Sequence, residues 1–171
     1  MKAFRGDVRP LRCVEGVIAA AALLGAFLGA SGVARAELAS CTDGPAAVRL
    51  QIDVDGVRSK EGLIAITIYP DDPSRFLVHH GQLGILRTPA QVPVVHVCAA
   101  LPSAGRYAVV VYHDANGDMK FNRTPLGGPA EDYGLSNDPP TFLGLPNLES
   151  VLIVTRPGDN AIHIRMRRAN R

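Results

Sequence analysis

The sequence predicts an all-β fold: a seven- or eight-stranded antiparallel β-sandwich that follows an N-terminal signal peptide. Short segments in which apolar and polar residues alternate recur along the chain, and turns rich in Gly, Pro and Asp separate them. No window after residue 36 shows a convincing repeat of apolar residues at helical spacing. The length of residues 37–171 suits one compact core, so we expect a single β-sandwich domain there.

The first three strands are expected at residues 48–54, 63–69 and 92–97. In the first of these, apolar residues alternate with Arg, Gln and Asp, which is typical of a strand with one buried face. The second is mostly apolar and is followed by Pro70 and two aspartates, which favour a turn. The third contains four valines and leads into Cys98.

Further strands are expected at residues 106–113, 150–155 and 161–166, with weaker ones near residues 76–77 and 85–87. The strand at 106–113 follows the turn Pro-Ser-Ala-Gly and contains three consecutive valines, so we expect it to be buried. The last two strong strands are separated by the sequence Arg-Pro-Gly-Asp-Asn, which favours a turn. The weaker pair leaves the strand count at seven or eight.

Residues 1–36 have the pattern of a cleavable signal peptide. A basic start is followed by an uncharged apolar segment at residues 17–33 and then by Ala34-Arg35-Ala36, the small-x-small pattern of a cleavage site. The alternative is a membrane anchor, but this segment is short and contains three glycines. We therefore expect cleavage after Ala36 and export to the periplasm or the exterior, with no membrane span in the mature chain.

The charge of the mature chain argues against a nucleic-acid partner. Residues 37–171 contain 13 Lys and Arg against 14 Asp and Glu, so most of the basic character belongs to the leader. Nucleic-acid binding usually needs a clustered basic face. The only such cluster, Arg165, Arg167 and Arg168, alternates with apolar residues and is interpreted as the solvated face of the last strand.

Cysteine usage agrees with export. Cys13 would leave with the leader, and Cys41 and Cys98 would enter an oxidising compartment, so a disulfide between them is predicted. Two buried free thiols are the alternative.

A second signal overlaps Cys41. Residues 38–41, Leu-Ala-Ser-Cys, have the form of a bacterial lipobox, in which the cysteine is acylated. However, Arg35 and Glu37 separate these residues from the apolar segment, and a lipid on Cys41 would leave Cys98 without a partner. A lipoprotein anchored at Cys41 therefore remains the alternative to a free exported protein.

The loop that follows the strand at 106–113 is the strongest candidate for a site. Asp114, Asn116 and Asp118 occupy alternate positions around Gly117, and oxygen side chains at this spacing can converge on Ca²⁺. The same residues also suit a turn that hydrogen-bonds only to itself. Both interpretations remain open.

The rest of this loop matches a calcium-binding loop only in part. Asn122 lies at the ninth position, where a ligand is expected, but the sixth position is Met119 rather than Gly and the twelfth is Pro125 rather than Glu. Another carboxylate would be needed, and Glu131 is a nearby source. The candidate metal ligands are therefore listed together as Asp114, Asn116, Asp118, Asn122 and Glu131.

Catalysis has weaker support in the sequence. His113 and Ser136 are the residue types of a hydrolase, but neighbours on a strand point to opposite faces, so His113 and Asp114 cannot form an oriented pair. No serine lies in a Gly-x-Ser-x-Gly sequence. We therefore expect a binding or structural module for an unknown protein or small molecule, with a hydrolase-like enzyme that uses the His113 loop as the alternative.

An apolar cluster lies in the same loop-rich region. Phe142, Leu143, Leu145 and Pro146 follow two prolines. They are interpreted either as a cap on the open end of the sandwich or as an exposed docking surface.

Three sequences carry a resemblance to a known family: GLIAITIY at 62–69, GRYAVVVYHDANGD at 105–118, and the G-x-S-N that ends at Asn137. On these the chain resembles the bacterial domain-of-unknown-function 2141 family of small exported proteins, over roughly residues 41–167. The resemblance implies a prealbumin-like, or transthyretin-like, sandwich and no established activity. An enzyme branch of that fold carries a C-terminal Tyr-Arg-Gly-Ser, which this chain lacks.

Overall fold

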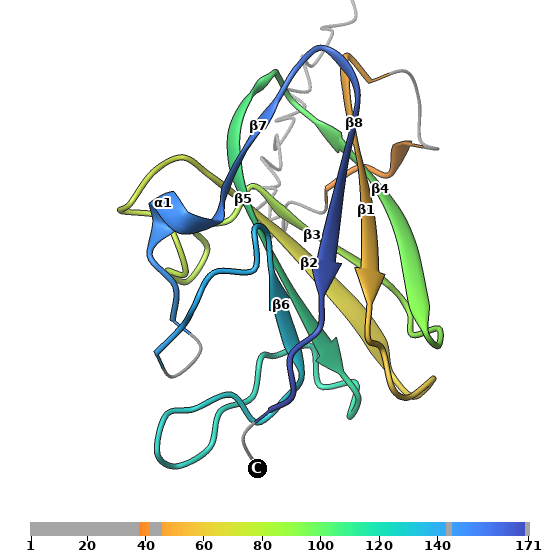
Figure 1. Ribbon diagram of the computed structural model, residues 1–171, viewed down its shortest axis with the longest axis vertical. Coiled ribbons are helices and arrows are strands. Elements are labelled where there is room, and N and C mark those ends of the chain that lie inside the picture. Colours follow the sequence, from red (N-terminus) through yellow and green to blue (C-terminus); the bar gives the residue numbers. More distant parts are fainter. Residues whose placement is uncertain (1–37, 42–45, 143–144, 170–171) are drawn as a thin grey trace, which may run out of the picture. The chain divides into compact units, whose positions relative to one another are not determined.

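The computed structural model describes residues 38–41, 46–142 and 145–169, which form two facing β-sheets (Figure 1). The expected signal peptide at residues 1–36 lies outside the described residues. The small sheet has the order β4 (Val94–Leu101), β1 (Val48–Asp55) and β8 (Gly158–Arg165). The large sheet consists of β3 (Gly84–Pro89), β2 (Leu63–Pro70), β5 (Gly105–Asp114), β6 (Tyr133–Leu135) and β7 (Leu152–Thr155).

The main core lies between the two sheets. In β1 every second residue is buried, and Leu50, Ile52 and Val54 are fully buried. They belong to one cluster with Ile66 of β2 and Val109 of β5, which are also fully buried. Because burial of one such aliphatic side chain contributes about 1.5–3 kcal/mol, this layer supplies much of the stabilisation.

The expectation of a purely antiparallel sandwich is wrong at one pair of strands. β8 pairs with β1 in parallel, with Val48 opposite Gly158 and Asp55 opposite Arg165. The alternation of apolar residues determines which face of a strand is buried, but it carries no information about the direction of the neighbouring strand. The parallel pair arises because the chain crosses from the large sheet at β7 to the small sheet at β8.

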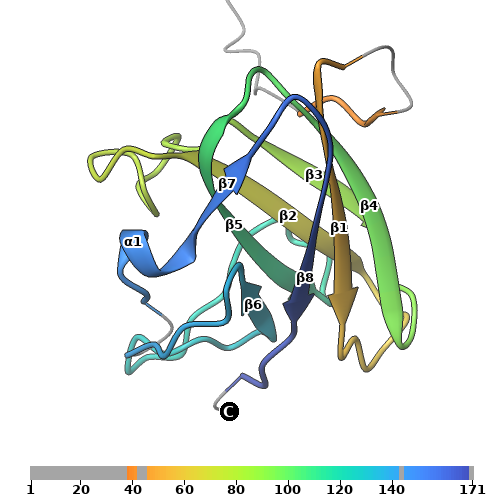
Figure 2. The same ribbon diagram turned by 45° about the horizontal axis from the view of Figure 1, so that its top comes forward.

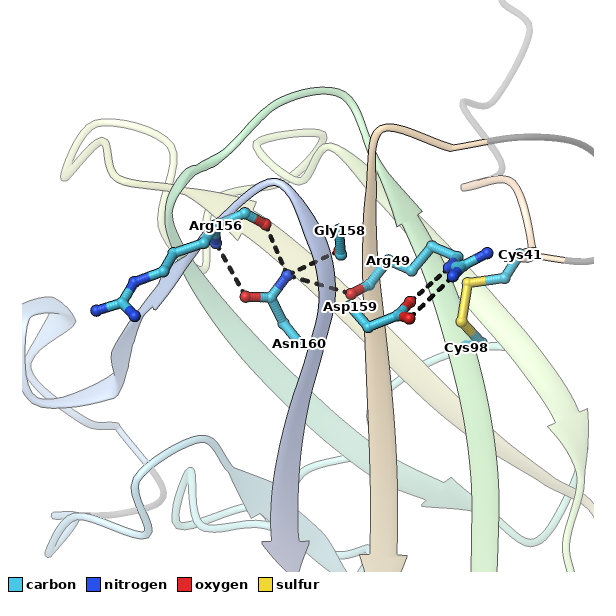
Figure 3. Close-up of polar contacts among 7 residues, drawn as sticks. All are labelled: Cys41, Arg49, Cys98, Arg156, Gly158, Asp159 and Asn160. Atoms are coloured by element: carbon cyan, nitrogen blue, oxygen red, sulfur yellow. Dashed lines mark hydrogen bonds and ion pairs between the residues drawn. A yellow bond between two sulfur atoms is a disulfide. The ribbon is translucent and has the colours of Figure 1, made fainter.

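Asn160 fixes this crossing, which lies at the top of the molecule in Figure 2 and is drawn in Figure 3. Its Oδ1 accepts the Arg156 N–H at 2.9 Å, and its Nδ2 donates to the carbonyls of Arg156 at 2.8 Å and Gly158 at 3.1 Å. The same Nδ2 reaches the carbonyl of Arg49 on β1 at 3.3 Å. Gly158 has a φ of +88°, which glycine adopts most readily. One side chain therefore ties the turn to the adjacent strand.

A short N-terminal strap, residues 38–41, closes one edge of the sandwich. The Ala39 carbonyl accepts the Ala100 N–H of β4 at 3.0 Å, and Cys41 forms a disulfide with Cys98. Leu38 packs against the main core and against Gly84 of β3, where any Cβ would approach the Leu38 Cβ to 2.8 Å. The strap thus contacts a strand of each sheet. The predicted disulfide is present.

The opposite edge is also bridged. Tyr133 of β6 and Arg167, just beyond β8, exchange backbone hydrogen bonds of 3.1 and 2.6 Å. Gly134 lies so close to Ile164 that an added Cβ would come within 2.6 Å of its side chain. Close approach of the two sheets at this edge therefore depends on glycine.

The strand expected at 92–97 is observed as β4, four residues longer at its end, and the strand expected at 161–166 begins three residues earlier, at Gly158, inside the predicted turn. Three further differences concern whole elements. Residues 76–77, predicted as a weak strand, lie in a turn. β6 was not predicted, and the start of the strand expected at 150–155 belongs to α1 (Leu148–Val151), a single helical turn. Among the described residues, no helix is long and apolar enough to cross a membrane.

Candidate ligand-binding site

The outer face of the large sheet carries a second cluster of buried side chains that differs from the main core. Tyr69 of β2, Tyr112 of β5 and Tyr133 of β6 belong to this cluster, with Phe76 and Phe121 packed against them from the loops. Strand alternation places these tyrosines on the face opposite the aliphatic core. Two long loops, residues 71–83 and 115–132, lie on the side of this sheet away from β1 and β4 (Figures 1 and 2).

The two loops and the outer face line a pocket of about 560 Å³ that is widely open to solvent. Its floor includes Tyr69, Ile85 and Tyr112 from the sheet. The first loop contributes Leu77, Val78 and a pair of histidines, and the second contributes Met119 and Phe121. Cavities of this size, with apolar and aromatic linings, are typical of small-molecule sites.

Three residues that line this cavity have left-handed backbone conformations. Leu77 has a φ of +56°, His80 of +61° and Met119 of +63°. This conformation costs free energy for residues other than glycine, more so for bulky ones, and it tends to concentrate at functional sites. The two loops are thus held in conformations that local preference alone would not select.

Two basic side chains line the pocket. Lys120 and Arg123 line it, and no Asp or Glu is among its described lining residues. The Arg123 guanidinium lies 5.1 Å from the centre of the Phe121 ring, and its Nη1 donates to the Gly127 carbonyl at 2.8 Å. A cation is therefore held directly beside an aromatic wall.

Burial raises the pKa of both tyrosines on the floor. For Tyr112 a nearby Arg87 guanidinium opposes this effect, through its charge and a hydrogen bond, while Asp114 and Glu131 add to it. Nε and Nη2 of Arg87 are buried and have no hydrogen-bond partner within the described part of the chain. An incompletely partnered guanidinium therefore lies next to the cavity floor.

The predicted metal loop begins with Asp114, whose side chain is fully buried at the end of β5. Its Oδ1 accepts the Asp118 N–H at 3.1 Å, and its Oδ2 accepts the Met119 N–H at 2.8 Å. Asn116 Oδ1 also accepts the Asp118 N–H, at 3.2 Å. The turn is thus organised by its own backbone donors.

The remaining predicted ligands join the same network. Asp118 accepts the Lys120 N–H at 2.9 Å and the Asn122 side-chain amide at 3.0 Å, and this second bond contributes most to lowering the pKa of Asp118. Glu131 accepts the Asn122 N–H at 3.0 Å. The structure therefore brings all five predicted residues together in one hydrogen-bonded loop.

This arrangement leaves calcium binding a prediction. Oδ1 of Asn122 is buried and has no hydrogen-bond partner within the described residues. Burial raises the pKa of Glu131, and the charges of Asp114 and Asp118 raise it further, against the Asn122 hydrogen bond. In the described part of the chain, no three His, Cys, Asp or Glu side chains are placed to hold a metal ion.

His113 is buried at the opposite side of this loop. Its Nε2 lies 2.7 Å from the Glu61 carbonyl, which can only accept, so Nε2 carries a proton. His113 lines a second cavity, of about 460 Å³, together with Glu131 and Asp132. Burial alone would raise the pKa of Asp132, but hydrogen bonds from Arg58 and the Ala169 N–H outweigh it and lower that pKa.

Ser136, the other residue considered for catalysis, is fixed in the core. Its hydroxyl bonds with the backbone of Val109 and the carbonyl of Val151. The hydroxyl therefore has no hydrogen bond with His113, which is held by Glu61.

The apolar segment at 142–146 is partly exposed. Phe142 is 78% exposed, and Leu145 is 50% exposed and lines the larger cavity. Leu143 lies outside the described residues. The exposed Phe142 does not act as a buried cap.

The sequence did not identify the larger cavity. Tyr69, Tyr112 and Phe121 looked like ordinary strand and loop residues, and the tertiary fold is what brings them together. The available signal was the alternation that places tyrosines on the face opposite the valines, together with the length of the two flanking loops.

A family model described as "Uncharacterized protein conserved in bacteria (DUF2141)" matches residues 52–163. This match confirms the resemblance noted in the sequence. No curated protein and no solved structure was found to match the chain.

Proposed function

Because the chain belongs to the DUF2141 family of uncharacterized bacterial proteins, we propose its role on structural grounds: it is an exported module that binds a small molecule. The cavity of about 560 Å³ between the loops at 71–83 and 115–132 carries this proposal. Beside the buried aromatic cluster of the outer face, apolar side chains of the two loops, among them Val78 and Met119, stay about half exposed and line this pocket. Exposed apolar side chains that line one concave site suit a ligand.

Export is supported by two independent features. The leader pattern ends at Ala36, and the disulfide between Cys41 and Cys98 is typical of proteins outside the cytoplasm. Because the Cys41 sulfur is bonded to Cys98, it is not free to carry a lipid chain. We therefore favour a free periplasmic or secreted protein, with a prealbumin-like sandwich at residues 37–171, over the lipoprotein alternative.

Intact mass and N-terminal sequencing of protein from its native compartment test this part of the proposal. We expect a mature chain that begins at Glu37. A blocked, acylated Cys41 as the first residue would overturn it in favour of the lipoprotein.

A binding role has more support than hydrolysis. The His113 ring donates to the Glu61 carbonyl, and the Ser136 hydroxyl bonds to the backbone in the core. Activation of a nucleophile needs a base that is hydrogen-bonded to it. The observed pairing instead favours His113 as a residue that holds the end of β5 in place.

Methyl-resolved NMR with a mixed library of small organic molecules tests the binding role. We expect ligands to shift the methyl signals of Ile85, Leu77 and Met119, which line the cavity. The matched control is Ile162 of β8, on the other sheet, whose signal should stay in place. Binding that moved Ile162 and left the cavity signals unchanged would refute the proposed site.

A further inference from the structure

We propose that the pocket on the outer face takes a neutral aromatic molecule that carries a hydroxyl or carbonyl oxygen. This inference rests on the proposed binding function and names its ligand class. Three properties of the pocket support it: two hydroxyl groups of buried residues that face it, aromatic rings on its floor, and nearby charges that are engaged by groups of the protein itself.

The two hydroxyl groups belong to β2. Thr67 and Tyr69 line the pocket, and they are only 6% and 8% exposed. Neither hydroxyl has a hydrogen-bond partner among the described residues, and neither is one of the fully buried polar atoms there that lack a partner. Each hydroxyl therefore belongs to the small accessible part of its residue, which faces the pocket. Polar groups of buried residues are usually hydrogen-bonded, and a ligand can supply the partner here.

Strand geometry places these hydroxyl groups on one side of the sheet. Thr67 and Tyr69 are two residues apart on β2, so their side chains leave the same face, with Cα atoms roughly 7 Å apart. Burial raises the pKa of Tyr69, so its hydroxyl is protonated at neutral pH. Each hydroxyl can donate one hydrogen bond and accept others. An uncharged oxygen on a ligand matches both capacities.

The floor of the pocket suits an aromatic body. Tyr69, Tyr112 and Phe121 line it, and the rings of Tyr112 and Phe121 pack with centroids 5.5 Å apart and planes tilted by 57°. Aromatic rings attract further rings in tilted, offset or edge-on arrangements. Met119 lines the same pocket and is 52% exposed, so its thioether is accessible to a ligand ring. A flat aromatic molecule would therefore make favourable contacts with both kinds of side chain.

The two basic side chains that line the pocket already interact with the protein. Lys120 lies in the field of Asp118, and the two opposite charges attract each other. The Arg123 guanidinium donates to the Gly127 carbonyl at 2.8 Å and lies 5.1 Å from the centre of the Phe121 ring. Neither cation therefore requires a charge on the ligand.

The charges beside the tyrosine floor oppose one another. Arg87 acts on Tyr112 through its positive charge and a hydrogen bond. The negative charges of Asp114 and Glu131 act on the same tyrosine with the opposite effect. A charged ligand would lose its hydration without meeting a field of one sign, whereas a neutral ligand loses little.

Five two-ring probes test the proposal: 2-naphthol, naphthalene, decahydro-2-naphthol, 2-naphthoate and 2-naphthylmethylammonium. Their affinities are measured at neutral pH from the methyl signals that line the pocket. We expect 2-naphthol to bind about fivefold more tightly than naphthalene, which lacks the hydrogen bonds, and about fivefold more tightly than the saturated alcohol, which lacks the ring contacts. The anion and the cation should each bind at least about tenfold more weakly than 2-naphthol, since each charge would leave water for neutral hydroxyl partners.

Other outcomes would overturn this inference. Naphthalene that binds as tightly as 2-naphthol would contradict the hydrogen-bonded oxygen, and a saturated alcohol that binds equally well would contradict the aromatic preference. Tightest binding of either ion would contradict neutrality. If no probe binds, but the library experiment finds pocket ligands of another class, this inference fails alone. If neither experiment finds a pocket ligand, the proposed function fails with it.

Variants locate the hydrogen bonds. Tyr69→Phe and Thr67→Val each remove a hydroxyl and nearly keep the shape of the side chain, so each should weaken 2-naphthol binding about threefold and leave naphthalene binding unchanged. Tyr133→Phe is the matched control, because it removes a hydroxyl that bonds with Thr141 on the same outer face, and Tyr133 is not among the described lining residues of the pocket. It should change neither affinity. Equal losses of 2-naphthol binding in Tyr69→Phe and Tyr133→Phe would show that the hydroxyl groups of the pocket do not hold the ligand.

Discussion

The two faces of the large sheet differ in what covers them. On the inner face, Ile64, Ile66 and Ile68 of β2 are fully buried against the small sheet. On the outer face, Thr67 and Tyr69 of the same strand line the pocket, and loops and the short helix α1 cover this face. Successive residues of β2 therefore belong to two different environments.

This contrast shows how the sandwich can separate stability from binding. A second sheet is a regular surface that aliphatic side chains can fill at the density of a protein interior. Loops are irregular, and over the outer face they leave about 560 Å³ between aromatic side chains. We therefore expect changes on the inner side to affect folding most and changes on the outer side to affect ligand binding most.

The largest effect on folding should come from the disulfide. Replacing Cys41 and Cys98 by Ala releases a chain segment with a sequence separation of 57 residues, which should lower the free energy of unfolding by about 4 kcal/mol in the chain-entropy model. Urea denaturation measures the free energy of unfolding of this double variant. Its affinity for a ligand should be unchanged under conditions in which the variant stays folded. Quantitative labelling of both cysteines in the denatured, unreduced protein would show that the bond is absent in solution.

Adjacent residues of β2 allow the sharpest comparison of the two faces. Ile66→Ala should lower the free energy of unfolding by about 3 kcal/mol, because it leaves a cavity in the aliphatic layer. Thr67→Ala removes fewer atoms, from a buried side chain that lines the open pocket, and should cost less than about 1 kcal/mol. Equal losses in urea denaturation would mean that the outer face is as well packed as the core.

The pH dependence of stability should reveal the buried carboxylate at the edge of the outer face. Burial raises the folded-state pKa of Glu131, so the folded protein binds more protons than the unfolded chain, and its stability falls as the pH rises through and above the ordinary glutamate range. Glu131→Gln cannot titrate, yet its amide oxygen still accepts the Asn122 N–H. Measured in chelator between about pH 4 and about pH 7, the variant should lose less stability than the wild type.

Asp132 provides a control of opposite sign. The pKa of Asp132 is lowered in the folded state. Asp132 therefore contributes to the free energy of unfolding at pH values above the ordinary aspartate pKa, and this contribution is lost as the pH falls. Asp132→Asn should therefore reduce the loss of stability at low pH and leave the stability change at higher pH as in the wild type. Parallel pH curves for the wild type and Glu131→Gln would contradict the assignment of the raised pKa.

The smallest expected effect is that of calcium on the loop beside the cavity. If the loop binds Ca²⁺ with the millimolar affinity typical of weak extracellular sites, several millimolar calcium should raise the Tm of chelator-stripped protein by about 3 °C. Asp114→Asn should abolish this increase. A melting curve that does not respond to calcium would leave the turn as a structure held by its own hydrogen bonds.

The sequence predicted the inner side of the molecule better than the outer side. Strands such as residues 48–54 and 106–113 were predicted to within two residues at each end, because one-sided burial produces strict alternation. The pairing of Cys41 with Cys98 followed from the compartment and the cysteine count. The strands depend on the local alternation of apolar and polar residues, and the disulfide depends on the number of cysteines.

The features that were not predicted depend on tertiary contacts. β6 has only three residues and is defined by its pairing with β5, while residues 76–77 carry a strand-like composition that the left-handed Leu77 interrupts. The parallel partner of β1 comes from a distant part of the chain. The candidate loop residues lie close together in the chain and share one hydrogen-bonded loop, whereas the pocket next to them needs side chains from three separate segments.

The crossing between β7 and β8 has a consequence for how the protein opens. These strands are consecutive in the chain but lie in different sheets, and Asn160 joins their turn to β1. Neither sheet can then separate without disturbing the other, since the Tyr133–Arg167 bridge and the strap hold the two edges as well. The slowest-exchanging amide hydrogens of β1 and β2 should accordingly share one free energy of opening, because the two strands unfold together as one cooperative unit. Amide hydrogens in the loops over the outer face should exchange through local openings of lower free energy.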